Sequence, residues 1–107
     1  MSEAPLSLYP YVKPPAVTMQ SLLRETAADH GLTALDLMAD TRKRFIAHAR
    51  QDFMWRARQI RTRTGEHRYS FPMIGRFLGG MDHTTVVHGV RAHSKRLAEA
   101  QGRANAA

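Results

Sequence analysis

The stretch SFPMIGRFLGGMDHTTVVHGV, residues 70–90, predicts two helices separated by a glycine pair. Pro72 suits the first turn of the first helix, where its missing N–H is not needed. Gly79 and Gly80 break the chain, and Asp82 is a natural N-cap for the second helix. Three apolar residues of the first helix are expected to face inward: Ile74, Phe77 and Leu78.

The second helix has two distinct faces when its residues are placed at intervals of about 100°. One face is apolar and is expected to join the core: Val86, Val87, Val90 and Leu97. The opposite face is polar: Thr84, Thr85, His88, Arg91 and Lys95. Two helices joined by a short glycine turn, the second with a displayed polar face, are typical of a helix-turn-helix.

The residues at the start of this helix suit the reading of DNA bases. A threonine offers its methyl group to the thymine C5-methyl and its hydroxyl to a base edge. His83 and His88 can donate to bases or phosphates, and Asp82 can accept from cytosine N4. Arg91 and Lys95 lie further along the helix, where the DNA backbone is expected. The free N–H groups of the helix N-terminus also favour phosphate.

Simpler interpretations of the same residues stay open. Asp82 can serve only as an N-cap, or as a cap and a base contact together. Thr84 and Thr85 can be tolerated on a solvated face. A metal site at His83 and His88 is not expected, because a spacing of five residues puts them about 140° apart and no carboxylate completes a set such as H-E-x-x-H.

Positive charge is concentrated in the C-terminal part of the chain. Residues 1–41 carry two basic and five acidic residues, whereas residues 42–107 carry fourteen and four. The net charges of the two parts are therefore −3 and +10, which add up to the +7 of the whole chain. Such asymmetry indicates a polyanionic partner, most often nucleic acid. A basic composition that only aids solubility is the alternative.

Length and composition predict one domain of 107 residues with a modest core. The absence of cysteine excludes disulfides and thiolate metal sites and favours a reducing cytoplasm. No apolar run approaches the roughly 18 residues of a membrane span, and the proline-containing start does not resemble a secretory signal. We therefore expect a cytoplasmic protein with no membrane partner, located at the nucleoid if it binds DNA.

The chain is expected to divide into an arm, a helical body and a tail. Residues 1–17 hold four of the five prolines, which predicts an extended or disordered arm. Residues 18–98 form the body, which shows no strand pattern. The last helix is expected to end at about Ala98, so residues 99–107 are predicted to be a flexible tail. The fold class is all-α, with about five helices around a helix-turn-helix.

The first half of the body predicts two short helices. Thr18 or Ser21 is expected to cap the first, which Gly31 stops. Four residues share its inward side: Leu22, Leu23, Thr26 and Ala27. Thr33 is expected to cap a second helix that runs through Leu35 and Met38 and ends before Asp40.

A longer helix follows the basic residues 42–44. Its apolar stripe recurs at helical spacing: Ile46, Ala49, Phe53, Ala57 and Ile60. Trp55 lies about 180° from that stripe. Burial of the helix on both sides is favoured over contact of Trp55 with the arm or a partner, because tryptophan usually packs. Residues 61–70 then form a polar, basic connection.

The pattern of residues 70–90 resembles the signature of the C-terminal DNA-binding domain of the bacterial replication initiator DnaA. That signature reads approximately S-[LF]-P-x-I-G-x-x-[FL]-G-G-R-D-H-[ST]-T-V-x-H-[AG], and the match is long and nearly ungapped. Upstream, TRKRFIAHARQDFMWRAR (residues 41–58) is similar to the long basic helix of that domain. The resemblance covers about residues 18–98 and implies an all-helical, DnaA C-terminal-like fold that binds double-stranded DNA.

The resemblance also implies roles for individual residues. Four match readers of base edges in the major groove: Asp82, His83, Thr84 and Thr85. Five match contacts to the DNA backbone or at the start of the first motif helix: Arg50, Arg58, Phe71, Pro72 and His88. An arginine that enters the minor groove corresponds to Arg42 or Arg44.

The sequence departs from the family's pattern at three places. Met81 stands where the family usually has arginine, which removes a DNA contact. Arg56 occupies a position that the family generally fills with an apolar residue. The connection of residues 61–70 is several residues longer. Because of these departures, the resemblance does not imply that the protein recognises the initiator's usual DNA site, the box, with the usual affinity. It still implies binding to duplex DNA.

Three roles remain open, and an enzyme is the least expected class. No G-x-x-x-x-G-K-[ST] loop occurs, so neither ATP binding by that route nor any other cofactor is expected. The protein could regulate transcription, as a phage or mobile-element regulator does, or modulate replication initiation at initiator-like boxes. It could instead be a protein-interaction adaptor with weak DNA binding. The expected partners are double-stranded DNA and, beyond it, the replication initiator or the transcription machinery.

Overall fold

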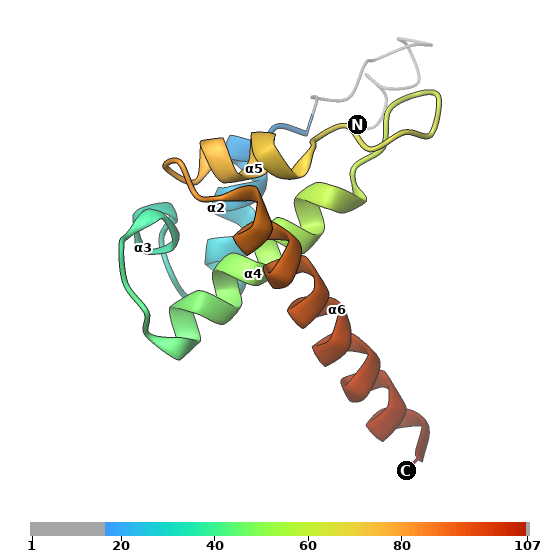
Figure 1. The fold of residues 1–107 in the computed structure, drawn as a ribbon. Coiled ribbons are helices and arrows are strands. Elements are labelled where there is room, and N and C mark those ends of the chain that lie inside the picture. Colours follow the sequence, from blue (N-terminus) through green and yellow to red (C-terminus); the bar gives the residue numbers. More distant parts are fainter. Residues whose placement is uncertain (1–16, 107) are drawn as a thin grey trace, which may run out of the picture.

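The computed structural model describes residues 17–106, and within that range the chain forms five helices (Figure 1). They are α2 (Met19–Asp29), α3 (Ala34–Met38), α4 (Arg44–Gln59), α5 (Phe71–Phe77) and α6 (His83–Ala106). A single β-bridge between Arg61 and His67 is the only strand-like pairing of these residues. The predicted all-α fold is confirmed. The predicted arm, except for Val17, lies outside the described residues. None of the helices in the described range is long and apolar enough to cross a bilayer.

Capping boxes fix the starts of α2 and α3. Thr18 and Ser21 cap α2 together, because each side chain accepts a hydrogen bond of 3.1 Å from the other's backbone N–H. Thr33 and Asp36 form the same pair at the start of α3. Gly31, with a φ of +70°, lets the chain turn between the two helices. Both starts agree with the sequence prediction.

Helix α4 is the centre of the fold and contacts each of the other four helices. Ala49, Phe53 and Ala57, three members of its predicted apolar stripe, are fully buried. The Phe53 ring packs against Phe77 of α5, with 5.7 Å between ring centroids. Trp55 is half-buried on another side of α4. This helix is therefore covered on more than one side, as predicted.

One apolar residue that was expected in the core, Leu97, is exposed instead, and so is Leu35 of α3. Leu35 is 81% exposed, and Leu37 is the α3 residue that enters the core. Leu97 is 41% exposed, although it continues the apolar stripe of α6. Figure 1 shows the reason, since the second half of α6 extends beyond the other helices of the described range.

The end predicted for the last helix is also wrong. Helix α6 does not stop near Ala98 but continues to Ala106, so the part of the predicted tail that is described is helical. The segment AEAQGRANA is rich in strong helix formers, and its single interior glycine, Gly102, weakens a helix by only about 1 kcal/mol. No proline or positive-φ residue interrupts it.

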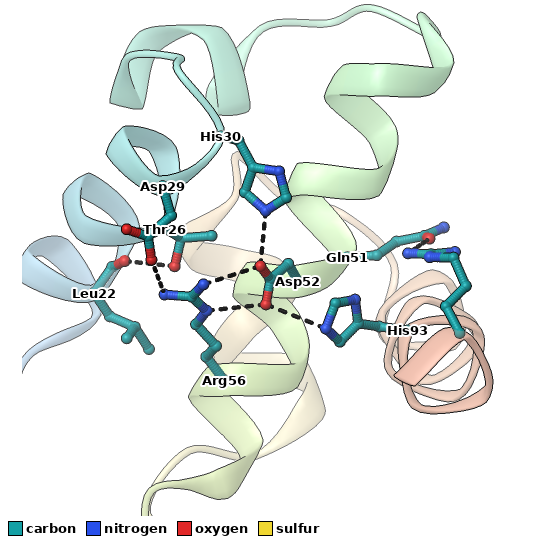
Figure 2. Close-up of polar contacts among 9 residues, drawn as sticks. Leu22, Thr26, Asp29, His30, Gln51, Asp52, Arg56 and His93 are labelled. Carbon is teal, nitrogen blue, oxygen red and sulfur yellow. Dashed lines mark hydrogen bonds and ion pairs between the residues drawn. The ribbon is translucent and has the colours of Figure 1, made fainter. Parts of the chain in front are cut away.

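A charged cluster lies between α2, α4 and α6 (Figure 2). The carboxylate of Asp52, which is only 6% exposed, accepts hydrogen bonds of 2.9 and 3.1 Å from Arg56. It also lies 2.7 Å from Nε2 of His30, while Arg56 donates to Asp29 of α2. Arg56, the departure from the family's apolar pattern, therefore neutralises a buried acid.

Burial alone would raise the pKa of Asp52. The hydrogen bonds from Arg56 and His30 and the positive charge of Arg56 outweigh this effect, and the pKa lies below its ordinary value. Asp52 is therefore ionised at neutral pH and joins elements from three parts of the chain.

The turn between α5 and α6 packs directly on Gly75. The carbonyl of Gly75 accepts hydrogen bonds from the N–H groups of Leu78, Gly80 and Met81, at 3.2, 3.1 and 2.8 Å. A Cβ atom at position 75 would collide with the Met81 carbonyl oxygen. Gly79 and Gly80 have φ angles of +92° and +89°, which favour glycine. The direction of α6 therefore depends on glycine at three positions.

Substitution of Gly75 tests this dependence. Gly75→Ala is expected to lower the free energy of unfolding by about 2–3 kcal/mol, because the new methyl group must displace backbone. The matched control is Gly102→Ala, where a Cβ meets nothing within 4 Å and a gain of up to about 1 kcal/mol is expected. Thermal unfolding followed by circular dichroism measures both, and equal melting temperatures would contradict the assignment.

Candidate nucleic-acid interface

Asp82 caps α6 and still displays its carboxylate. Its Oδ2 accepts a 3.0 Å hydrogen bond from the N–H of Thr84, and its backbone carbonyl accepts from Thr85 and Val86. The hydrogen bond from Thr84 lowers the pKa of Asp82. The side chain is nevertheless 66% exposed. The two interpretations of Asp82, a cap and an exposed acceptor, are therefore compatible with one conformation.

The predicted polar face of α6 is displayed in full. All seven residues assigned to DNA on this helix are exposed: Asp82, His83, Thr84, Thr85, His88, Arg91 and Lys95. On the other side Val86 is fully buried, and Val87 and Val90 are half-buried. We call residues 82–85 the reading segment. It projects from the core because the apolar side of the same helix is held against α4 and α5.

The start of α5 is held by Arg58. Ser70 caps α5 by accepting from the N–H of Met73 at 3.2 Å, and Pro72 lies exposed in the first turn. The guanidinium of Arg58 lies 4.0 Å from the centroid of the Phe71 ring and donates a 2.9 Å hydrogen bond to the Tyr69 carbonyl. Arg58, predicted to contact phosphate, thus fixes the entry to the helix-turn-helix.

Arg50 has a comparable structural role. Its Nε and Nη2 atoms donate 2.8 Å hydrogen bonds to the carbonyls of Leu37 and Ala39, at the end of α3. Arg50 was predicted as a phosphate contact, but these two bonds tie α3 to the middle of α4. The sequence carried no signal for this use, because both acceptors are backbone groups of another helix.

The structure brings Arg42 close to the reading segment. Arg42 and Thr85 line one open hollow between the start of α4 and the start of α6, with Met81 and Met54 also in its wall. Arg44, the alternative for the minor-groove arginine, is exposed but does not line this hollow. Of the two alternatives, Arg42 therefore has the closer relation to the reading segment.

Sequence reasoning assigned no role to the polar residues that join α4 and α6. Arg96 donates a 2.8 Å hydrogen bond to Gln51, and Nε2 of His93 lies 3.3 Å from Oδ1 of Asp52 (Figure 2). One signal was available, since Asp52 is an acid in an otherwise basic helix and lies four residues before Arg56. The contribution of α6 was not visible, because His93 is distant in sequence.

The fold and the displayed helix define the class as an all-α helix-turn-helix domain. Residues 19–92 match the family described as the bacterial dnaA protein helix-turn-helix. The chain belongs to this family.

Curated relatives match 70% or more of this chain. The chromosomal replication initiator protein DnaA of Caulobacter sp. (strain K31) is 43% identical over 75 residues, which is 70% of this chain and 14% of the relative. The protein of the same name from Cereibacter sphaeroides is 38% identical over 82 residues, 77% of this chain and 17% of the relative. The protein of that name from Sphingopyxis alaskensis is 34% identical over 88 residues, which is 81% of this chain and 18% of the relative. The chain thus spans less than a fifth of the length of these curated relatives.

The structural use of Arg50 can be tested by stability. Arg50→Ala is expected to lower the free energy of unfolding by about 1–3 kcal/mol, because two charge-assisted hydrogen bonds to the end of α3 are lost. Arg91→Ala, at an exposed position on α6, is the control and should change stability by less than about 0.5 kcal/mol. Urea unfolding measures both; an Arg50 variant as stable as the Arg91 variant would refute the link.

Proposed function

We propose that this protein binds double-stranded DNA in a sequence-specific manner, with the reading segment in the major groove. The observation that carries the proposal is the display of Asp82, His83, Thr84 and Thr85 at the front of a helix whose opposite side is locked into the core. Short hydrogen-bonding side chains at this place suit base edges. Membership in the DnaA helix-turn-helix family supports the same function and favours sites that resemble initiator boxes.

In the proposed complex, the protein contacts two neighbouring grooves of the DNA, on either side of one sugar-phosphate strand. Thr85 and Arg42 border the same hollow. If Thr85 reads the major groove, the strand that separates the two grooves crosses this hollow, and Arg42 reaches the adjacent minor groove. His88, Arg91 and Lys95, further along α6, then supply contacts to phosphate. In this proposal Arg50 and Arg58 act mainly by positioning other groups.

The biological role that we propose is modulation of replication initiation at such boxes, in the nucleoid. The relatives quoted above are replication initiators, and the match covers 14% and 17% of the length of two of them. A protein with this surface could compete with the initiator for a site or assist it. Control of transcription from the same boxes is the second candidate. Neither role requires catalysis by the helix-turn-helix.

A gel shift separates DNA binding from the adaptor alternative. A duplex that carries an initiator box is compared with a duplex of the same composition in scrambled order. Preference for the box supports the proposal. Equal and weak retention of both duplexes would favour an adaptor that kept the fold. Selection of bound duplexes from a random pool would then identify the preferred site directly.

Salt dependence tests the contribution of phosphate contacts. With about three such contacts, from Arg42, Arg91 and Lys95, a plot of log affinity against log salt concentration is expected to have a slope of about −3. Fluorescence anisotropy of a labelled box duplex over a range of salt concentrations measures the slope. A slope near zero would mean that basic side chains do not neutralise phosphates in the complex.

Thr85 tests the base-reading assignment. Thr85→Ala is expected to cost roughly 1–3 kcal/mol on the preferred duplex and little on random DNA. Thr85→Val keeps a methyl group and Thr85→Ser keeps the hydroxyl, so the pair shows which group is read. Arg91→Ala is the control and should weaken both duplexes alike. An equal loss on both duplexes for Thr85→Ala would remove Thr85 from the base contacts.

A further inference from the structure

His93 lies where the DNA-reading helix crosses the centre of the fold. Its side chain is 14% exposed, and its Nε2 lies 3.3 Å from Oδ1 of Asp52 on α4 (Figure 2). Its ring lies 5.5 Å from the ring of Trp55, also on α4. Among the described residues, this contact and the hydrogen bond from Arg96 to Gln51 are the polar links between α4 and α6.

The geometry selects one neutral form of the imidazole. A carboxylate can only accept, so Nε2 of His93 must carry the proton that faces Asp52. Nδ1 is then unprotonated, and it is buried without a hydrogen-bond partner. A second proton on the ring would produce a buried N–H group with no acceptor, which is costly.

The charges around His93 also oppose a second proton. Asp52 is the one buried carboxylate here, and it already accepts from Arg56 of α4 and lies 2.7 Å from His30 at the end of α2. Arg96 adds a positive charge from α6. The other acid of the cluster, Asp29 of α2, is half exposed and pairs with Arg56.

The balance of these effects favours the neutral ring. Burial lowers the pKa of His93, Asp52 raises it, and the positive charges of Arg96, Arg56 and His30 lower it again. The net shift is downward from the ordinary value of 6.5.

We propose that His93 is a positioning residue for DNA recognition, which holds α6 on α4 only while its imidazole is neutral, so that mild acid releases the reading helix. This inference rests on the proposed function, because its consequence for the cell is a loss of DNA binding. No base or phosphate needs to touch His93. It acts through the placement of the reading segment, on the same helix.

The direction of the effect follows from the lowered pKa. A histidine that is neutral in the folded protein and charged once released stabilises the fold fully above the ordinary pKa of about 6.5, and this stabilisation is lost as the pH falls below it.

The binding experiment uses anisotropy of a labelled box duplex at pH 7.5, 6.5 and 5.5 and constant ionic strength. Wild-type affinity is expected to fall by up to about tenfold between pH 7.5 and 5.5. His93→Gln keeps an N–H donor for Asp52 but cannot titrate, and its affinity should stay level or rise. His67→Gln, a change of an exposed histidine in the connection between α4 and α5, is the control and should keep the wild-type fall. The same fall in wild type and His93→Gln, or no fall in wild type, would overturn the proposal.

A second readout does not depend on DNA. Trp55 is the only tryptophan of the chain, so its emission wavelength reports directly on the contact with His93. In wild type a red shift with a midpoint below pH 6.5 is expected, and in His93→Gln no shift is expected. If no duplex binds at pH 7.5, the proposed function is refuted, while this titration still tests whether His93 holds α6 on α4. If His93→Gln does not fold, the wild-type midpoints for emission and affinity must coincide, and disagreement between them refutes the inference.

Discussion

The carbonyl oxygen of Gly75 accepts three backbone N–H groups, and this single acceptor sets the angle at which α6 leaves α5. The arrangement is tight because the Met81 carbonyl lies where any Cβ at position 75 would be. A reading helix must enter a groove in one orientation, since the side chains that read bases are short. In the proposed complex, the backbone turn therefore decides whether Asp82 and Thr85 face DNA together.

The apolar core that supports this turn has a charged cluster beside it, centred on the buried Asp52. Replacing a buried ion pair with apolar residues is often neutral or stabilising, so the Asp52–Arg56 pair is not explained by stability alone. Its geometry offers another reason. One carboxylate accepts hydrogen bonds from Arg56 of α4, lies 2.7 Å from His30 at the end of α2 and lies 3.3 Å from His93 of α6. Because hydrogen bonds are directional, we expect this cluster to favour one arrangement of the three helices.

Much of the fold could be predicted from sequence because its signals are local. Caps, glycine stops and helical periodicity predicted the bounds of α2, α3 and α5 closely, and the two faces of α6 followed from angle alone. The wrong predictions concern contacts between one helix and other elements of the fold. The exposure of Leu97 depends on where the neighbouring helices end, and the acceptors of Arg50 and Arg58 are carbonyls of other elements. Spacing within one helix contains no information about such partners.

These structural arginines change how affinity and specificity would be divided. Arg50 and Arg58 each donate hydrogen bonds to backbone carbonyls of the protein itself. The apolar side chain of Met81 lines the hollow beside Thr85. In the proposed complex, non-specific attraction would then come mainly from the exposed cations of α6 and from Arg42. Because phosphate contacts strengthen binding to every sequence equally, fewer of them leave a larger share of the binding energy to base contacts. In the proposed complex, such a surface favours rapid dissociation from non-cognate DNA and stable binding at a small number of specific sites.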